Sequence, residues 1–403
     1  MNLILVLTLP VLLILNPMTA AVVKADPNRR IIEFIDPTYG GRIRQIFNSA
    51  GDEHNLYHYR SVFNADNSRM LGIEQPQGST DYIVTLYDGD GIFKKRLFTQ
   101  AEYDWTLIWD KRDHRYFFTR KEGTVYRYDV EKSRAEALRT FDKPTLAAGP
   151  SGLSLNGKGD RLLLRMSDNS VRNFRLPSLD DERISRIEIP DGWIANWDKL
   201  RFTGYHDFFA IMLEQKRPVI AGVSLEPPKT RIYDGATGQI LHTHNALNVG
   251  HHDFSSDGKL AFVEGYFNQE HGMRVRVVNL DGTDNRVVFT APRAKLRYVR
   301  NYHITWPAGV SDWFILSFFP QTGRLPPSYE PYLDELVQVF VDGRSKVLAR
   351  TGTTCAENFW AQPQQSLSAD GTRVLFNSNG SCSVGQIGGE NSGTIDQRIL
   401  YLK

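Results

Sequence analysis

Seven copies of one short pattern constrain this chain more than any other feature. Each copy has an apolar anchor residue, a polar turn and then an apolar strand, as in Trp109-DKRDHR-YFFT and Phe254-SSDGK-LAFV. A second hairpin follows most copies, and its Asp-Gly or Thr-Gly turn supplies positive φ. Each unit is therefore predicted to hold about four antiparallel strands. The anchors, which lie 46 to 61 residues apart, are Phe63, Trp109, Leu155, Phe202, Phe254, Trp306 and Leu367.

Seven four-stranded units at this period predict an all-β fold, a seven-bladed β-propeller. The last copy is short, since residues 397–403 supply only a third strand. Residues 30–47 are typical of a strand, a turn and a strand, and we expect Arg42 to Phe47 to complete the final blade and close the ring. Two packed β-sandwiches would explain neither the period nor the truncated copy. We therefore expect one propeller domain over residues 22–403.

The first 21 residues have a different character from the rest. They read MNLILVLTLPVLLILNPMTAA, with an apolar run from Leu3 to Leu15 and small residues before the first charge at Lys24. This run is short for a membrane span, so residues 1–21 are predicted to be a cleavable secretory signal peptide. No later stretch approaches membrane length. We expect an exported protein, extracellular or periplasmic, that has no membrane partner and is a monomer.

Charge and cysteine content narrow the partners and the compartment. The 48 basic and 46 acidic residues give a formal charge of +2, which lacks the basic field that a nucleic acid requires. Two cysteines exclude a multi-disulfide framework and a four-thiolate zinc site. Cys355 precedes the first strand of the final blade and Cys382 follows its second, so both fall at one end of the blade. A disulfide is predicted, with a metal site completed by histidine as the alternative.

In a propeller the first strand of each blade lines the central channel, so equivalent positions meet around one funnel. Imidazole, guanidinium, ammonium and carboxamide groups at such a mouth suit an anionic ligand. His251 and His303 could instead bond between blades, and Arg60 and Lys199 could be solvated rim charges. Three residues before the anchors the copies carry Arg60, Thr106, Gly152, Lys199, His251, His303 and Gln364, and five before they carry His58, Asp104 and Gln362.

Three stretches, DPTYGGRIRQIF, HNLYHYRSVFNADNSRML and AENFWAQPQQSLSADGTRVLFNSN, resemble the first and last blades of the oligogalacturonate lyases. The wider set of propeller polysaccharide lyases, including ulvan lyases and rhamnose-glucuronate lyases, is similar. The resemblance in architecture extends over the whole mature chain, whereas the specific sequence matches are these short stretches. It implies β-elimination in a uronic-acid-containing glycan, with an anionic oligosaccharide or polysaccharide as partner.

In oligogalacturonate lyases a manganese ion is held by histidines and a glutamine, and two of these histidines form a His-Pro-His stretch. The matching stretch here is Gln362-Pro363-Gln364, and carboxamides are poor ligands for transition metals. His303 and His251 remain as candidate metal ligands. The site is therefore either metal-free or holds a divalent ion such as calcium or manganese, and the departure argues against oligogalacturonate as the substrate.

Such a lyase needs a cation on the uronate carboxylate, a base for the C5 proton and an acid for the leaving oxygen. We expect His303 and His251 to act as the imidazole pair that includes the base. Arg60 is the expected clamp, and Tyr302 or His58 the expected acid. The residues assigned to substrate binding are Lys199, Arg300, Gln362, Gln364, Tyr59, Trp105 and Asn358.

Two other functions are compatible with the sequence. One is a non-catalytic exported propeller that binds a protein or a glycan, like the TolB-type scaffolds, which share the Asp-Gly turns. The other is a glycoside hydrolase, which would need two carboxylates facing each other across the channel. The channel register offers only Asp104 for that role.

Overall fold

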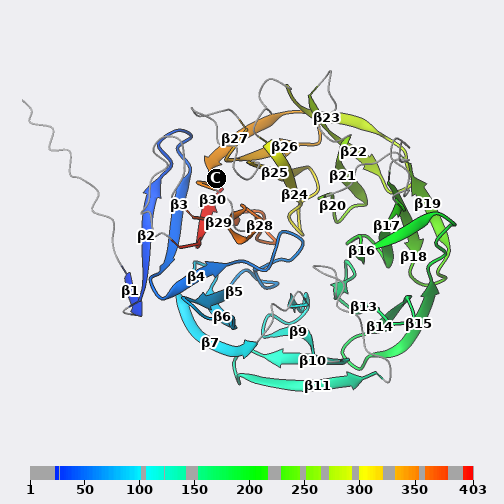
Figure 1. Cartoon of the computed structure of the whole chain (residues 1–403), viewed down its shortest axis with the longest axis horizontal. Helices are drawn as coiled ribbons and strands as arrows, with labels where there is room; N and C mark the ends of the chain where they lie inside the picture. Colours follow the sequence, from blue (N-terminus) through cyan, green and yellow to red (C-terminus); the bar gives the residue numbers. More distant parts are fainter. Residues whose placement is uncertain are drawn as a thin grey trace, which may run out of the picture.

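Seven antiparallel sheets surround one central axis in the computed structural model (Figure 1). This arrangement confirms the predicted seven-bladed propeller. No helix in the described part of the chain is long and apolar enough to cross a membrane. The structure describes residues 23–26, 28–100, 106–121, 123–141, 153–216, 228–245, 251–264, 272–292, 299–320, 332–353, 359–379 and 394–402.

Six blades are made of consecutive strands, which follow from the inside outwards. Blade 1 has β4 (Gly51–His54), β5 (Arg69–Pro76), β6 (Tyr82–Asp88) and β7 (Phe93–Gln100), and blade 2 has β8 (Ile108–Trp109), β9 (Tyr116–Lys121), β10 (Thr124–Asp129) and β11 (Arg134–Thr140). Blade 3 has β12 (Ser154–Leu155), β13 (Arg161–Arg165), β14 (Ser170–Arg175) and β15 (Asp180–Arg186), and blade 4 has β16 (Trp193–Phe202), β17 (Phe208–Gln215), β18 (Lys229–Asp234) and β19 (Ile240–His244). Blade 5 has β20 (Asp253–Phe254), β21 (Lys259–Glu264), β22 (Met273–Asn279) and β23 (Arg286–Ala291), and blade 6 has β24 (Val299–Thr305), β25 (Trp313–Pro320), β26 (Glu335–Phe340) and β27 (Ser345–Arg350).

Blade 7 joins the two ends of the chain. Its inner strands are β28 (Ser366–Leu367), β29 (Arg373–Ser378) and β30 (Asp396–Tyr401), followed outwards by β3 (Arg42–Asn48), β2 (Arg29–Ile35) and β1 (Val23–Asp26). Arg42 pairs with Tyr401 and Ile46 with Gln397, which confirms that the N-terminal strand closes the ring. Figure 1 shows the blue strands lying directly beside the red β30. The hairpin β1–β2 extends this sheet beyond the four expected strands.

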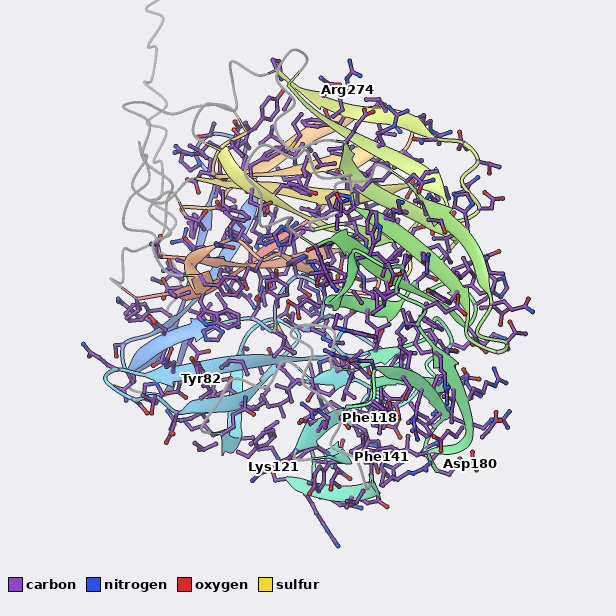
Figure 2. All side chains as sticks on the ribbon, turned by 45° about the vertical axis from the view of Figure 1, so that its right-hand side comes forward. Tyr82, Phe118, Lys121, Phe141, Asp180 and Arg274 are labelled. Atoms are coloured by element: carbon purple, nitrogen blue, oxygen red, sulfur yellow. The ribbon has the colours of Figure 1, made fainter. Side chains whose placement is uncertain are left out.

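Apolar side chains pack between neighbouring blades. Phe118 and Phe141, labelled in Figure 2, belong to the cluster between blades 2 and 3, which also contains Leu155 and Phe174. Comparable clusters lie between blades 4 and 5, blades 5 and 6, and blades 6 and 7. Such packing follows from strands whose two faces both meet another sheet, and it leaves polar side chains to the channel and the rim.

The wall of the channel is held together by side chains that lie one residue before an anchor. Ser154 Oγ accepts a hydrogen bond from the Phe202 backbone NH at 3.0 Å. Asp253 Oδ2 accepts one from the NH of Trp306 at 2.7 Å. These hydrogen bonds to the next blade satisfy the buried side-chain oxygens of Ser154 and Asp253.

A buried ionic network connects the closing hairpin to blade 1. The Arg29 guanidinium at the start of β2 lies 2.5 Å from Glu53 and 2.9 Å from Glu74, and all three side chains are at most 3% exposed. The Tyr87 hydroxyl donates to Glu53. Burial opposes the charge on Arg29, but Glu53, Tyr87 and Glu74 together raise its pKa.

Blade 1 departs from the predicted pattern in a way that shapes the channel. Its innermost strand β4 ends at His54, and the anchor Phe63 makes only an isolated bridge to Met70. The residues between them, 55–61, belong to no strand and form what we call the channel segment. Asn55 Nδ2 donates to the Gln364 carbonyl, and Tyr57 takes a φ of +83°, a strained value for a residue with a side chain.

The fully buried His54 makes a testable contribution to stability. Burial lowers its pKa to about 3, so the folded state stays neutral while the unfolded chain takes up a proton below pH 6.5. Between those values the protein should lose about 1.4 kcal/mol of stability per pH unit from this group alone. Urea titrations at several pH values from 6 to 4 give the free energy of unfolding at each pH. This free energy should fall less steeply with decreasing pH for His54→Gln than for wild type. Equal slopes would contradict the assignment.

Candidate functional site

Three imidazole rings meet in the channel. His58 comes from the channel segment, His251 from the residues just before β20, and His303 from β24. The ring centroids are 4.1 Å apart for His58 and His303, 4.7 Å for His251 and His303, and 5.2 Å for His58 and His251. The structure therefore brings the predicted pair together and adds His58 to it. We call these residues the imidazole cluster.

The imidazole cluster is neutral at physiological pH. Burial lowers the pKa of His58 and of His303 well below the usual value, and the neighbouring His251 and Lys199 lower both further. Both rings are at most 1% exposed, and their four nitrogens find no hydrogen-bond partner in the described structure. Unsatisfied buried nitrogens cost free energy, which is typical of a site that a ligand completes.

His251 is the half-buried member of the imidazole cluster, and its tautomer is defined. Its Nδ1 lies 3.2 Å from Asn301 Oδ1, which also accepts the backbone NH of Tyr302. Because this oxygen only accepts hydrogen bonds, Nδ1 carries the proton and donates it in the bond, and Nε2 of the neutral ring keeps its lone pair. Burial, assisted by the charge of Lys199, lowers the pKa of His251 to about 3. With this pKa the ring stays neutral near pH 7, so a lone pair is available, but the ring is a weaker base than an ordinary imidazole.

Lys199 and Tyr59 form a polar pair beside the imidazole cluster. Lys199 Nζ donates to the Tyr59 hydroxyl at 2.9 Å, and the Tyr59 ring centroid lies 3.9 Å from that of His58. Burial lowers the pKa of Lys199 to about 7, and the charge of Arg201 contributes. Lys199 sits where the pairing of β16 with β17 shifts register between Asn196 and Arg201, an irregularity that redirects side chains.

Two of the described arginines near the channel, Arg60 and Arg201, are already engaged. Arg60 is 4% exposed and its Nη1 donates to the Leu153 carbonyl. Arg201 pairs with Asp253 at 3.2 Å and stacks on the Tyr59 ring, 4.1 Å from its centroid. The predicted clamp Arg60 therefore faces a structural partner, and the half-exposed Lys199 is better placed to meet a carboxylate.

The structure separates the remaining candidates. Gln364 lies at the channel, where its Nε2 donates to the Phe359 carbonyl at 2.7 Å and its buried Oε1 has no partner in the described structure. Gln362 is half-buried in the turn before it. Tyr302 alternates with His303 along β24 and packs into the core between blades 5 and 6, where it is 1% exposed. This placement favours Tyr59 or His58 over Tyr302 as the acid.

Several predicted positions cannot be compared with the structure. Residues 1–21, Asp104, Gly152 and the proposed disulfide partners lie outside the described residues, and so does the side chain of Arg300. The signal peptide, the disulfide and the contributions of these side chains therefore stay predictions. The other members of this group are Trp105, Asn358, Cys355 and Cys382.

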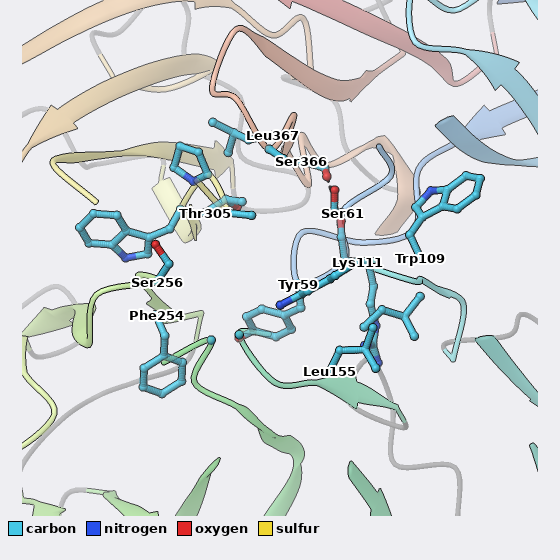
Figure 3. A pocket seen from close by; sticks show the side chains of 18 of the residues that line it. Tyr59, Ser61, Trp109, Lys111, Leu155, Phe254, Ser256, Thr305, Ser366 and Leu367 are labelled. Carbon is cyan, nitrogen blue, oxygen red and sulfur yellow. Dashed lines mark hydrogen bonds between the residues drawn. The ribbon is translucent and has the colours of Figure 1, made fainter. Parts of the chain in front are cut away.

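A cavity of about 370 Å³ occupies the channel (Figure 3), and its described lining includes His58 of the imidazole cluster but not His251 or His303. All seven anchors line it, which confirms their predicted position on the channel. His58, Tyr59 and Arg60 line it as well, and Figure 3 shows Tyr59 projecting toward the middle. The cavity reaches the cluster from the side of the turns that follow the anchors. The sequence predicts ligand entry from the opposite face, whose loops fall largely outside the described residues.

Three residues of the site could not be found from the repeat. Asn301 orients His251, Arg201 covers Tyr59, and Tyr57 contacts both His58 and His303 at centroid distances of 4.2 and 5.9 Å. Asn301 and Arg201 each lie two residues from positions that the register analysis singled out, His303 and Lys199. Arg201 and Asn301 lie at register irregularities in β16 and β24, and Tyr57 lies in the channel segment, so alternation along a regular strand does not predict where these side chains point.

The imidazole cluster does not form a metal site in this arrangement. No group of three His, Cys, Asp or Glu among the described residues could hold a metal ion. We therefore derive no chemical step through a metal.

Comparison with solved structures places the fold among known propellers. Oligogalacturonate lyase from Vibrio parahaemolyticus superposes with a TM-score of 0.64 at 12% identity, covering 95% of this chain and 98% of that chain. An oligogalacturonate lyase in complex with manganese gives a TM-score of 0.62 at 11% identity with the same coverage. The Cps50 (Swd1) propeller of Myceliophteria thermophila gives 0.51 at 11% identity, covering 89% of this chain and 98% of its own.

The shared feature is the propeller fold. No protein-family model and no curated protein matches the sequence. The similar structures are all 11–12% identical to this chain, so they establish its architecture.

Proposed function

We propose that this protein is a secreted polysaccharide lyase that cleaves a uronic-acid-containing glycan by β-elimination in the central channel. The observation that carries the proposal is the imidazole cluster, three neutral rings beside the Lys199–Tyr59 pair. The similarity to oligogalacturonate lyases in fold supports the reaction class. The apolar first 21 residues support export.

The residues can be assigned to the steps of the reaction. The Lys199 ammonium neutralises the substrate carboxylate, which makes the C5 proton more acidic. Nε2 of His251 takes that proton, and the electron pair forms the C4–C5 double bond as the C4–O bond breaks. The Tyr59 hydroxyl, held by Lys199, gives its proton to the leaving oxygen. His58, in contact with both Tyr59 and His251, lies where the proton can return from base to acid.

The direct test is the ultraviolet absorbance of an unsaturated uronate product. We expect absorbance to rise with one or more of pectic, ulvan, gum-arabic and glucuronan substrates, and chelation with EDTA to leave the rate unchanged. A binding-only propeller, the alternative function, gives no absorbance on any of them, with or without added calcium or manganese. A rate that depends on added metal would show that the described arrangement of the imidazoles is not the reactive one.

The charge on Lys199 predicts the alkaline limb of the pH profile. A lysine with a pKa of about 7 is charged below that pH and neutral above it, so clamping should fade as pH rises through 7. We expect kcat/KM to fall about tenfold for each pH unit above about pH 7. Lys199→Arg, which stays charged, should remove this limb up to pH 9. An unchanged limb in Lys199→Arg would show that another group titrates.

A further inference from the structure

Phe359 stands out among the aromatic side chains that the structure describes. It is 42% exposed, whereas the other described aromatic residues are buried or half-buried. It begins the 3-10 turn η3 (Phe359–Ala361), which leads toward β28 and the channel. Single exposed apolar residues are common on protein surfaces, so what distinguishes Phe359 is its contact with residues of the candidate site.

The backbone that presents Phe359 is firmly held. Its carbonyl accepts the Gln364 side chain at 2.7 Å, and the next carbonyl, that of Trp360, accepts Asn377 Nδ2 at 2.9 Å. The Trp360 ring stacks on His54 with centroids 4.1 Å apart and planes 7° apart. The exposed Phe359 is therefore held by a rigid backbone, and it loses little conformational entropy when a ligand binds.

The ring of Phe359 is connected to the imidazole cluster through one residue. Tyr57 stacks on Phe359 with centroids 5.6 Å apart and planes 18° apart. The same Tyr57 contacts His58 at 4.2 Å and His303 at 5.9 Å. The exposed Phe359 and the buried Tyr57 thus form a continuous aromatic contact from solvent to the imidazoles, which we call the aromatic step.

We propose that the aromatic step is a sugar-binding subsite, in which a pyranose ring next to the cleaved uronate stacks on Phe359. Pyranose rings carry C–H groups on one face, and these pack on an aromatic ring without needing a charge. The subsite therefore accepts a neutral or an acidic sugar, while Lys199 selects the uronate. This inference rests on the proposed function and gives the site a preference for chains longer than a disaccharide.

The test separates binding from catalysis. Calorimetry with tetrasaccharides and disaccharides of polyglucuronate and polygalacturonate should use His251→Ala, so that the ligand stays intact. Adding Phe359→Ala should weaken tetrasaccharide binding about tenfold and leave disaccharide binding unchanged, and Phe359→Trp should restore it. Ile35→Ala, an exposed apolar residue on the outer strand β2, is the matched control and should have no effect.

The outcomes distinguish this inference from the proposed function. The subsite alone is overturned if the wild-type enzyme forms unsaturated product and Phe359→Ala does not change the affinity for the tetrasaccharide. Absence of product combined with a Phe359-dependent tetrasaccharide affinity overturns the lyase and supports the subsite. Absence of any oligosaccharide binding by the wild-type protein or by His251→Ala overturns the subsite.

Discussion

Replacing His251 with alanine is expected to lower kcat/KM for β-elimination by about 10² to 10⁴-fold, the usual contribution of a positioned general base. The substitution removes the Nε2 lone pair that the contact with Asn301 leaves available. It should leave the fold intact, because His251 is only half-buried and its backbone carbonyl still accepts the NH of Ile304. The measurement is the initial rate of unsaturated product formation across the pH range.

The control for this experiment is His206→Ala, an exposed histidine in the turn between β16 and β17. That variant should keep wild-type activity. Added imidazole should partly restore the rate of His251→Ala, since a small base can occupy the space that the ring leaves. A His251→Ala enzyme within twofold of wild type would move the role of base to His303 or His58.

Replacing Arg29 with methionine should destabilise the protein by about 3–5 kcal/mol, because it leaves a fully buried carboxylate without its cation. Glu53 has no exposed surface, and burial already raises its pKa against the opposing effect of Arg29. Without Arg29 this carboxyl takes up a proton more readily. The loss of stability should therefore shrink as the pH is lowered toward 5. Guanidinium titrations at pH 8 and pH 5 measure both effects.

The matched control is Arg42→Met on the same N-terminal hairpin. Arg42 lies 3.1 Å from Glu33, but its side chain is 52% exposed and that of Glu33 35% exposed. Such a surface pair contributes about 0–1 kcal/mol, so this variant should unfold close to wild type. Equal losses for the two variants would show that the Arg29 network does not fasten the hairpin.

The sequence was sufficient to predict the architecture, because the sevenfold repeat determines the number of blades and of strands in each blade. The anchors end or follow the innermost strands, and Gly91 and Gly282 take the positive φ values of +83° and +86° that the turns required. Ring closure by β3 followed from counting strands in a copy that was one strand short. These features depend on local pattern, which a single sequence displays directly.

The site was only partly predictable, because its geometry depends on contacts between distant residues. His251 and His303 followed from the repeat register, since both precede anchors in ordinary blades. His58 and Tyr59 enter the channel because residues 55–61 leave the strand, and that path is held by the bond from Asn55 to Gln364, 309 residues away. No local pattern reports such a bond. Lys199 and Tyr59 were among the sequence candidates, but the hydrogen bond between them follows only from the placed side chains.

The pairing of β3 with β30 also orders the events of folding. Blade 1 can form as soon as residues 51–100 are available, whereas blade 7 needs both residues 42–48 and residues 396–401. Pairing over such a sequence distance is slow, and the apolar faces of blades 1 and 6 that border the gap stay open until it happens. During synthesis we therefore expect the unsealed ring to be the aggregation-prone form of this protein.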